Sequence, residues 1–416
     1  MAKPMMTLAD AQRLPRWRRP EGLLYLMAFA MPISFATWSA LLNNFVVEMA
    51  GFSGVEIGWL HTVREIPGLL AIGVIAILLI VREQVLAMVA LLLLGVASAL
   101  TAMFPTLGGI LMLTLLSSIG FHYFETVNQS LQLQWIDKDR APRVIGKIVG
   151  VGAGASLLAY GLLVATWDAL GLSYNTVYLA SGGLTAAIAV FAMVAYPKFA
   201  SPHPQNKHMV LRRRYWLYYA LQFMSGARRQ IFVVFAGFMM VERFGMKVSE
   251  MTALLLVNYL LQMFAAPVMG RALGRYGERK VMAFEYIGLT LVFLAYGGLY
   301  WFGWGLVVAG GLYILDQMFF ALAFALKTYF QKIADPADIA PTAAVAFTIN
   351  HIAAVFLPAA LGYMWATSPD HVFLMGAGMA LLALGLALLI PRHPEPGYET
   401  IFGSLPAVRA TANPAE

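Results

Sequence analysis

The amino-acid sequence predicts an all-helical integral membrane protein with twelve transmembrane helices in two six-helix halves. The chain of 416 residues is 60% hydrophobic and only 12% charged, whereas a soluble domain is about 25% charged. Apolar stretches of about 20 residues, each long enough to cross a hydrocarbon core of about 30 Å, recur along the whole chain. Short patterns of the first half also return in the second, as in membrane folds built from internal repeats.

The expected helices are defined by these apolar stretches. They cover residues 22–47, 55–80, 85–104, 107–131, 146–166, 174–196, 215–241, 250–269, 281–301, 304–326, 343–365 and 372–391. Prolines inside membrane helices are tolerated where neighbouring groups satisfy the freed backbone. We expect kinks at Pro32, Pro67, Pro267 and Pro358.

An internal repeat relates the two halves. The segment FVVEMAGFSGVEIGWL (45–60) aligns with GFMMVERFGMKVSEMTALL (237–255) at one constant offset. The aligned pairs are Glu48 with Glu242, Gly51 with Gly245, and Glu56 with Glu250. A second echo pairs IDKDRAP (136–142) with IADPADIAP (333–341), in each case between the fourth and fifth helix of a half.

The domain organisation follows from this repeat. We expect an N-terminal tail (1–21), a six-helix bundle (22–196), a basic linker (197–214), a second bundle (215–391) and a C-terminal tail (392–416). We also expect the two bundles to be related by a pseudo-twofold axis along the membrane normal.

The positions of Lys and Arg predict the orientation in the membrane. Most of these residues lie on the side of the two termini, and the opposite loops hold only Arg243 and Lys247. Basic loops face the cytoplasm, so we expect a multi-pass protein of the cytoplasmic (inner) membrane with both termini in the cytoplasm. The first apolar segment is too long for a signal-peptide core, and we expect no cleavage. The net charge of +7 then reflects this bias and not nucleic-acid binding.

Several classes of chemistry are excluded by residues that the sequence lacks. There is no cysteine, hence no disulfide, thiolate metal site or cysteine nucleophile. The sequence also contains no phosphate-binding Gly-rich loop with its Lys, no His-Glu-x-x-His and no Gly-x-Ser-x-Gly. We therefore expect neither an enzyme nor a metal or cofactor, and any work must be driven by an ion gradient or by the substrate's own gradient.

Twelve spans in two halves, cytoplasmic ends and a basic central linker resemble the major facilitator superfamily over essentially the whole chain. GRALGRYGERK (270–280) is similar to the family's Gly-x-x-x-Asp-Arg-x-Gly-Arg-Arg/Lys signature. The residues on pattern positions are Gly270, Arg275, Gly277 and Arg279, whereas the acidic position holds Gly274 and one basic position holds Glu278. The resemblance implies alternating access, with the signature residues in a charge network that steadies one end of the cycle.

Ionisable residues inside the predicted spans are candidates for function, because a charge near the bilayer centre costs about 3 kcal/mol. The resemblance implies that helices 1, 4, 7 and 10 line a central cavity, with helices 2, 5, 8 and 11 beside them. Candidate polar residues on these helices are His61, Arg64 and Glu65; Arg228 and Arg229; Asn258 and Gln262; Asp316 and Gln317; and Asn350 and His351.

The midplane charges favour an anionic substrate. Three arginines against Glu65 and Asp316 leave a net positive charge, and a positive cavity attracts an anion. At most one of Arg228 and Arg229 can face the cavity fully, because adjacent helical residues point about 100° apart, and the sequence leaves open which one. We expect that residue to bind the substrate together with Arg64. Alternatively, Arg64 pairs with Glu65 or Asp316 and merely pins helices together.

Proton coupling is the second expectation at these positions. The carboxylates on the predicted cavity helices are Glu65, Glu125 and Asp316, with Asp316 the best placed by depth. His122 and Glu125 lie one turn apart, and His titrates near neutral pH. Together with Gln129 and Gln132 they make a polar stripe, which fits either a route towards the cytoplasm or a buried hydrogen-bonded network.

The sequence thus favours a monomeric secondary active transporter that lies in the lipid bilayer and moves a small organic anion, with the proton as coupling ion. One alternative is a proton-antiport exporter of lipophilic or cationic drugs. An alternative of another class is a non-transporting sensor or assembly partner with the same fold. The altered signature favours this alternative.

Overall fold

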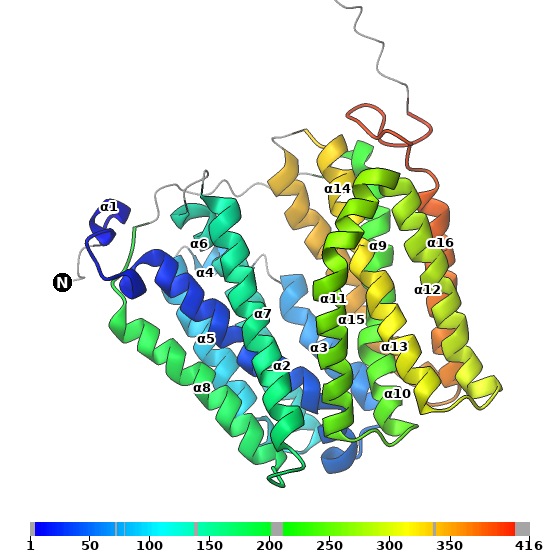
Figure 1. The fold of residues 1–416 in the computed structure, drawn as a ribbon, viewed down its shortest axis with the longest axis horizontal. Helices are drawn as coiled ribbons and strands as arrows, with labels where there is room; N and C mark the ends of the chain where they lie inside the picture. Colours follow the sequence, from blue (N-terminus) through cyan, green and yellow to red (C-terminus); the bar gives the residue numbers. More distant parts are fainter. Residues whose placement is uncertain are drawn as a thin grey trace, which may run out of the picture. The chain divides into compact units, whose positions relative to one another are not determined.

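The computed structural model describes residues 5–70, 73–78, 80–136, 140–200, 211–335 and 338–403. These residues form helices and connecting segments, apart from two isolated bridges (Figure 1). Parts of the predicted tails, of the linker 197–214 and of the 136–142 and 333–341 echoes lie outside the described residues. The chain divides into two compact units, Met1–Lys207 with Gly237–Tyr259, and His208–Ala236 with Leu260–Glu416.

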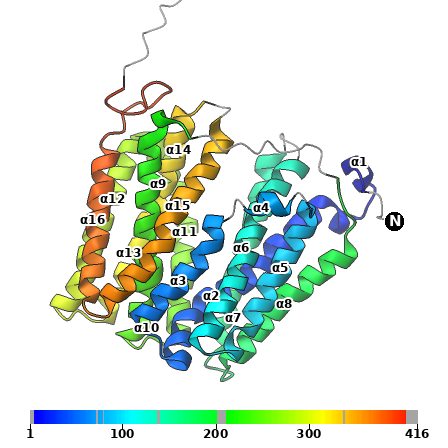
Figure 2. The same ribbon diagram turned by 180° about the vertical axis from the view of Figure 1, so that it is seen from behind.

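Unit 1 is a bundle held together by close helix contacts. Its helices are α1 (Leu8–Ala11), α2 (Pro20–Ala50), α3 (Gly54–Leu69), α4 (Gly73–Ile77), α5 (Glu83–Leu100), α6 (Leu107–Trp135), α7 (Ala141–Thr166), α8 (Tyr174–Ala195), α10 (Gly237–Glu242) and the beginning of α11 (Val248–Tyr276). Helix α5 packs on α6 and α8, and these helices are neighbours in both ribbon views (Figures 1 and 2). A Cβ atom at Gly182 would lie 2.5 Å from the carbonyl oxygen of Gly95. Small residues thus allow the backbones of α5 and α8 to approach closely.

Unit 2 is a second bundle. It contains α9 (Trp216–Gln230), a π-helix (Ile231–Ala236), the remainder of α11, and α12 (Glu278–Trp301), α13 (Leu306–Phe320), α14 (Phe324–Ile333), α15 (Ile339–Trp365) and α16 (Pro369–Ala387). Helix α9 packs on α15 and α16, and α12 packs on α16 and α13 (Figure 1). A Cβ atom at Gly226 of α9 would lie 2.4 Å from the carbonyl oxygen of Asn350 on α15. The contact between α9 and α15 therefore requires glycine at this position.

Ten helices in the described part of the chain are long and apolar enough to cross a membrane. The spans expected at 55–80 and 215–241 each contain more than one helical segment. In the first, α3 ends at Leu69 and α4 begins at Gly73. In the second, α9, the π-helix and α10 follow one another directly.

The turns aligned by the internal repeat adopt the same conformation. Gly51 and Gly245 have φ angles of 63° and 62°, in the left-handed region that glycine adopts without strain. After each glycine, a glutamate side chain accepts a hydrogen bond from the backbone N–H three residues before it. These bonds are 2.9 Å long, from Ser53 to Glu56 and from Lys247 to Glu250. The two halves thus start their second helix with the same local device.

Candidate functional site

Arg64 and Glu65, neighbours on α3, form an ion pair in unit 1. The Glu65 side chain is 4% exposed and that of Arg64 16% exposed. The Arg64 guanidinium also lies 5.7 Å from the centroid of the Trp38 ring on α2, a distance at which a cation and an aromatic face attract each other. Arg64 is thus held by the carboxylate that follows it on α3 and by an aromatic ring of α2.

Two histidines of unit 1 differ in their hydrogen bonding. His61 is 2% exposed, its ring lies 6.5 Å from that of Trp38, and neither ring nitrogen has a hydrogen-bond partner among the described residues. His122 on α6 has its Nδ1 atom 3.0 Å from both the hydroxyl and the carbonyl oxygen of Ser118. The Ser118 hydroxyl in turn donates to the Arg64 carbonyl oxygen, which connects α6 to α3.

The polar stripe on α6 continues from His122 to Glu125. The amide of Gln129 donates to Glu125 at 3.5 Å, and Gln132 lies further along the same helix. Glu125 is half-buried. The structure thus places the four predicted stripe residues on one continuous helix of unit 1.

Arg228 is buried in unit 2 and paired with a carboxylate. Its Nη2 atom lies 3.1 Å from Oε1 of Glu285 on α12, and the two side chains are only 2% and 1% exposed. The rings of Tyr286 and Phe320 lie 5.5 Å and 5.7 Å from the guanidinium. Breaking such a buried pair is costly, because the remaining charge would be left without compensation. Arg228 therefore holds α9 to α12.

Arg229 reaches a different helix. Its Nη2 atom lies 3.4 Å from Oδ1 of Asn350 on α15, and the side chain is half-buried. The amide nitrogen of Asn350 donates to the carbonyl oxygen of Gln222, one helical turn before Gly226, at 3.2 Å. The next residue, His351, bonds through Nδ1 to the carbonyl oxygen of Phe347 at 2.9 Å. Of the two adjacent arginines, Arg229 is the more accessible.

Asp316 on α13 is buried, with 2% exposure, and its Oδ2 atom has no hydrogen-bond partner among the described residues. The following residue, Gln317, accepts a hydrogen bond from Gln262 of α11 at 3.4 Å.

Asn258 lies in the part of α11 that belongs to unit 1 and is 3% exposed. Neither its amide nitrogen nor its amide oxygen has a hydrogen-bond partner within the described residues.

Sequence reasoning missed Glu285 and the aromatic partner Trp38. Glu285 is a carboxylate inside the predicted span 281–301, so the same rule that selected Asp316 applies to it. In the structure Arg228 of unit 2 is paired with Glu285, and Arg64 of unit 1 is paired with Glu65. The charge count made from the sequence did not include Glu285.

Comparison with known proteins identifies the family. The sequence model of the Major Facilitator Superfamily matches residues 23–358. The chain belongs to the Major Facilitator Superfamily. The fold is similar to that of a mutant of the nucleoside transporter NupG, with a TM-score of 0.73, 14% identity, and coverage of 89% of this chain and 99% of that chain.

Other solved transporter structures also have a fold similar to that of this chain. The unmutated nucleoside transporter NupG has a TM-score of 0.69 at 14% identity, covering 89% of this chain and 98% of that chain. An inward-facing, occupied bacterial homologue of the human lysosomal transporter Spinster has a TM-score of 0.64 at 12% identity, covering 89% and 95%. No curated protein matches the sequence. Membership in this superfamily makes the protein a multi-pass membrane transporter and not an enzyme.

The superfamily signature lies at the junction of α11 and α12. Gly270 and Arg275 belong to the last turns of α11, Gly277 has a φ of 78° between the helices, and Arg279 lies in the first turn of α12. Where the signature has an acidic residue this chain has Gly274, and a Cβ atom there would meet nothing within 4 Å. The signature residues are thus at a helix end, away from the interior ion pair on α9 and α12.

Proposed function

We propose that the protein is a proton-coupled secondary active transporter that moves a small organic anion across the cytoplasmic membrane by alternating access. The observation that carries the proposal is the placement of Arg229, a half-buried guanidinium that a helix positions beside the side-chain amide of Asn350. A guanidinium can donate two parallel hydrogen bonds to a carboxylate or phosphate and stays charged when partly desolvated.

Arg229 is the better candidate of the two adjacent arginines. Arg228 is committed to Glu285 and enclosed by Tyr286 and Phe320, so a substrate would have to displace a buried carboxylate to reach it. Arg229 contacts an uncharged amide in the hydrogen bond described above. A bound anion can approach the half-buried Arg229 without displacing the carboxylate that holds Arg228.

Asp316 is the proposed proton carrier. It is a buried carboxylate of α13, and one of its oxygens has no hydrogen-bond partner among the described residues. A carboxylate in an apolar interior favours its protonated form, and a nearby cation favours the ionised form. Glu65 and Glu125 remain candidates in unit 1.

An uncharged polar substrate is the second candidate. The observations that favour it are the balanced charges in the interior of unit 2 and the hydrogen-bonded amides of Gln262 and Gln317. Amides recognise uncharged hydroxyl, carbonyl and amine groups as readily as anions. NupG, a structural neighbour, is described as a nucleoside transporter, and nucleosides are the natural probes of this class.

The test is a binding and transport comparison with purified protein. A thermal-shift screen of carboxylates, phosphates, sulfonates and uncharged nucleosides will identify ligands, because a ligand that binds only the folded state raises the melting temperature. Calorimetry with the best anion should show at least about tenfold weaker binding for Arg229→Lys, which keeps the charge but loses the planar fork. Arg228→Lys should mainly lower stability. Unchanged anion binding by Arg229→Lys, or stabilisation by nucleosides alone, refutes the anion proposal.

Coupling is tested in proteoliposomes with an imposed pH gradient. Asp316→Asn should abolish accumulation of the substrate against its gradient but retain exchange of substrate for substrate, because the empty return step needs the proton. Glu65→Gln and Glu125→Gln test the two remaining candidates of unit 1 in the same assay. Full accumulation by Asp316→Asn would place the proton site elsewhere.

A further inference from the structure

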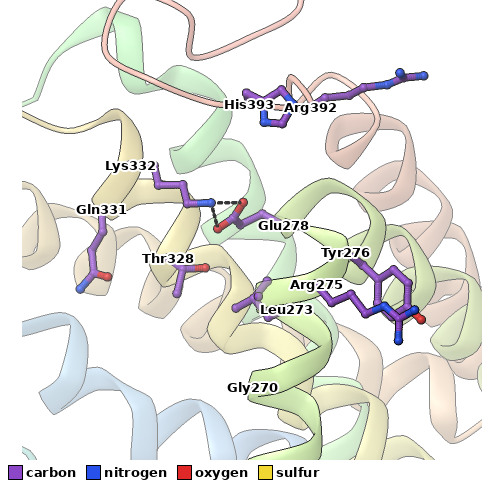
Figure 3. A pocket seen from close by; sticks show the side chains of 12 residues that line it. Gly270, Leu273, Arg275, Tyr276, Glu278, Thr328, Gln331, Lys332, Arg392 and His393 are labelled. Atoms are coloured by element: carbon purple, nitrogen blue, oxygen red, sulfur yellow. Dashed lines mark hydrogen bonds and ion pairs between the residues drawn. The ribbon is translucent and has the colours of Figure 1, made fainter.

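A surface cavity of about 590 Å³ lies at the junction of α11 and α12 in unit 2 (Figure 3). It is bordered by these two helices, by α14 and by the segment that follows α16. Basic side chains dominate its lining: Arg275, Lys332, Arg392 and His393, against the single carboxylate Glu278. The cavity is distinct from the interior residues discussed above, because none of them lines it.

The one carboxylate of this cavity is already neutralised. Lys332 of α14 contacts both oxygens of Glu278, at 2.8 Å and 2.9 Å. Glu278 is 3% exposed. Figure 3 shows Lys332 turned towards Glu278, whereas Arg275 extends away from that pair. The charges of Arg275 and Arg392 are therefore not balanced inside the cavity.

Arg275 and Arg392 form no ion pair with a carboxylate of the described residues. Arg275 lies over the ring of its neighbour Tyr276, with 5.4 Å to the centroid. A second cavity of about 390 Å³ shares Arg392 and His393 and adds Arg279. The two cavities together bring three arginines to one surface, and only Glu395 adds a further negative charge to their lining.

Two backbone features add to this positive surface. Helix α12 starts beside the cavity without a side-chain cap, so its first N–H groups and the positive end of its dipole face outward. Gly274 lines the cavity, and a Cβ atom there would meet nothing within 4 Å. This position is therefore open and carries no charge of its own.

We propose that this cavity binds a phosphate-bearing anion, whose negative charge balances those of Arg275 and Arg392. Arginine donates paired hydrogen bonds to phosphate oxygens, and a helix N-terminus adds backbone donors. The side of the membrane with most Lys and Arg is the one at which anionic lipid headgroups attract basic clusters. A lipid headgroup and a soluble phosphate share this chemistry.

Exposed apolar side chains continue along α12 away from the cavity. Phe284, Ile287 and Leu291 are 61%, 49% and 61% exposed. Their spacing of three and four residues places them on one face of the helix, where acyl chains of a lipid would lie. A headgroup in the cavity would thus have an apolar surface below it.

The test compares two substitutions of equal size at one open position. For the full-length protein in dodecyl maltoside micelles, which contain no phosphate, addition of phosphatidylglycerol should raise the melting temperature of the wild type and of Gly274→Asn. Gly274→Asp, which restores a carboxylate next to the arginines, should bind phosphatidylglycerol at least about tenfold more weakly. Arg275→Gln and Arg392→Gln should each weaken binding about fivefold, the contribution typical of one basic residue near an anionic lipid surface. Arg271→Gln, which removes the same charge outside the cavity, should bind like the wild type.

Inorganic phosphate and glycerol phosphate, added without phosphatidylglycerol, distinguish a soluble phosphate from a lipid headgroup as the ligand. A shift with phosphatidylglycerol alone assigns the site to a lipid headgroup, whereas an equal shift with the soluble phosphates assigns it to a soluble ligand. The proposal is overturned if none of the three probes stabilises the wild type. It is equally overturned if Gly274→Asp and Gly274→Asn respond alike.

Discussion

Arg228 and Arg229 are consecutive residues with different partners, Glu285 on α12 and Asn350 on α15. The divergence follows from helix geometry, since successive side chains of an α-helix point about 100° apart. One arginine is enclosed by aromatic rings and neutralised, and the other is half-buried beside an amide. Two identical side chains thus have separate tasks, holding helices together and, as we propose, binding substrate.

The buried pair should be essential for stability. Glu285→Gln leaves the Arg228 charge without compensation and should lower the free energy of unfolding by about 3 kcal/mol or more. The double variant Arg228→Met/Glu285→Met should recover most of this loss, because an apolar pair needs no compensation. Chemical unfolding in detergent micelles measures both. A single variant as stable as the wild type would show that the pair contributes little.

At the scale of elements, the contact between α9 and α15 positions Arg229. It depends on Gly226, where a side chain would meet the backbone of α15. The π-helix Ile231–Ala236 follows directly, and such irregular turns are frequent at functional sites. The local geometry of α9 therefore links helix packing to the position of the proposed binding residue.

Gly226→Ala should push α9 away from α15. The added methyl carbon would lie 2.4 Å from the carbonyl oxygen of Asn350, and a backbone atom cannot swing aside as a side chain can. We expect a loss of about 2 kcal/mol in unfolding free energy, within the range for overpacked sites, and weaker substrate binding through Arg229. Gly311→Ala on α13, where a Cβ atom meets nothing within 4 Å, is the matched control and should be neutral or slightly stabilising. Equal behaviour of the two variants would contradict this account.

Each half also ties the start of its first helix to the segment between its fourth and fifth helices by an ion pair. In unit 1, Arg140 lies 3.0 Å from Glu21. In unit 2, Arg212 forms a two-point pair with Asp338, with one contact of 2.8 Å, and the hydroxyl of Tyr215 donates to Asp338 at 3.0 Å. The signs of the charges are exchanged between the halves, while the elements that they join are the same.

The unit 2 pair predicts a pH-dependent contribution to stability. The hydrogen bonds from the Arg212 guanidinium hold the pKa of the Asp338 carboxyl below its usual range. A carboxylate with a lowered folded-state pKa stabilises the fold above its unfolded pKa of about 3.9, and this contribution is lost as the pH falls through the folded-state pKa. Asp338→Asn should therefore lower the melting temperature at pH 7, and the difference from the wild type should shrink below about pH 4. A difference that is constant from pH 7 to pH 3 would exclude this linkage.

At the scale of the whole molecule, the distribution of Lys and Arg predicts the orientation in the membrane. The turn that contains Lys247 belongs to the side of the membrane predicted to have few basic residues. The junction of α11 and α12 belongs to the opposite side, which has many basic residues. Both Lys247 and Arg271 are exposed. The two positions are therefore suitable reporters for opposite sides of the membrane.

The absence of native cysteine makes a labelling test direct. In intact cells, a membrane-impermeant maleimide should label Lys247→Cys, and it should label Arg271→Cys only after the membrane is permeabilised. The reverse pattern would place the termini outside the cytoplasm. Labelling of both positions in intact cells would contradict the assignment of the two turns to opposite sides.

The sequence by itself determined the membrane class, most of the spans and the repeated turns. These depend on local properties, namely runs of apolar residues, a glycine that adopts a positive φ, and a glutamate that caps the next helix within one turn. Gly51 and Gly245 were thus recognisable as equivalent from the sequence. The family followed from the same pattern together with the signature at 270–280.

Only the tertiary structure decided which partner each interior charge has. Glu285 lies on a different helix from Arg228, and Arg229 and Asn350 meet because Gly226 lets two backbones approach. The basic cavity at α11 and α12 also requires α14 and the segment after α16. Such contacts depend on the rotation and tilt of each helix, which are set by packing against its neighbours. Hydropathy specifies that a helix crosses the membrane and leaves open which way its polar residues face.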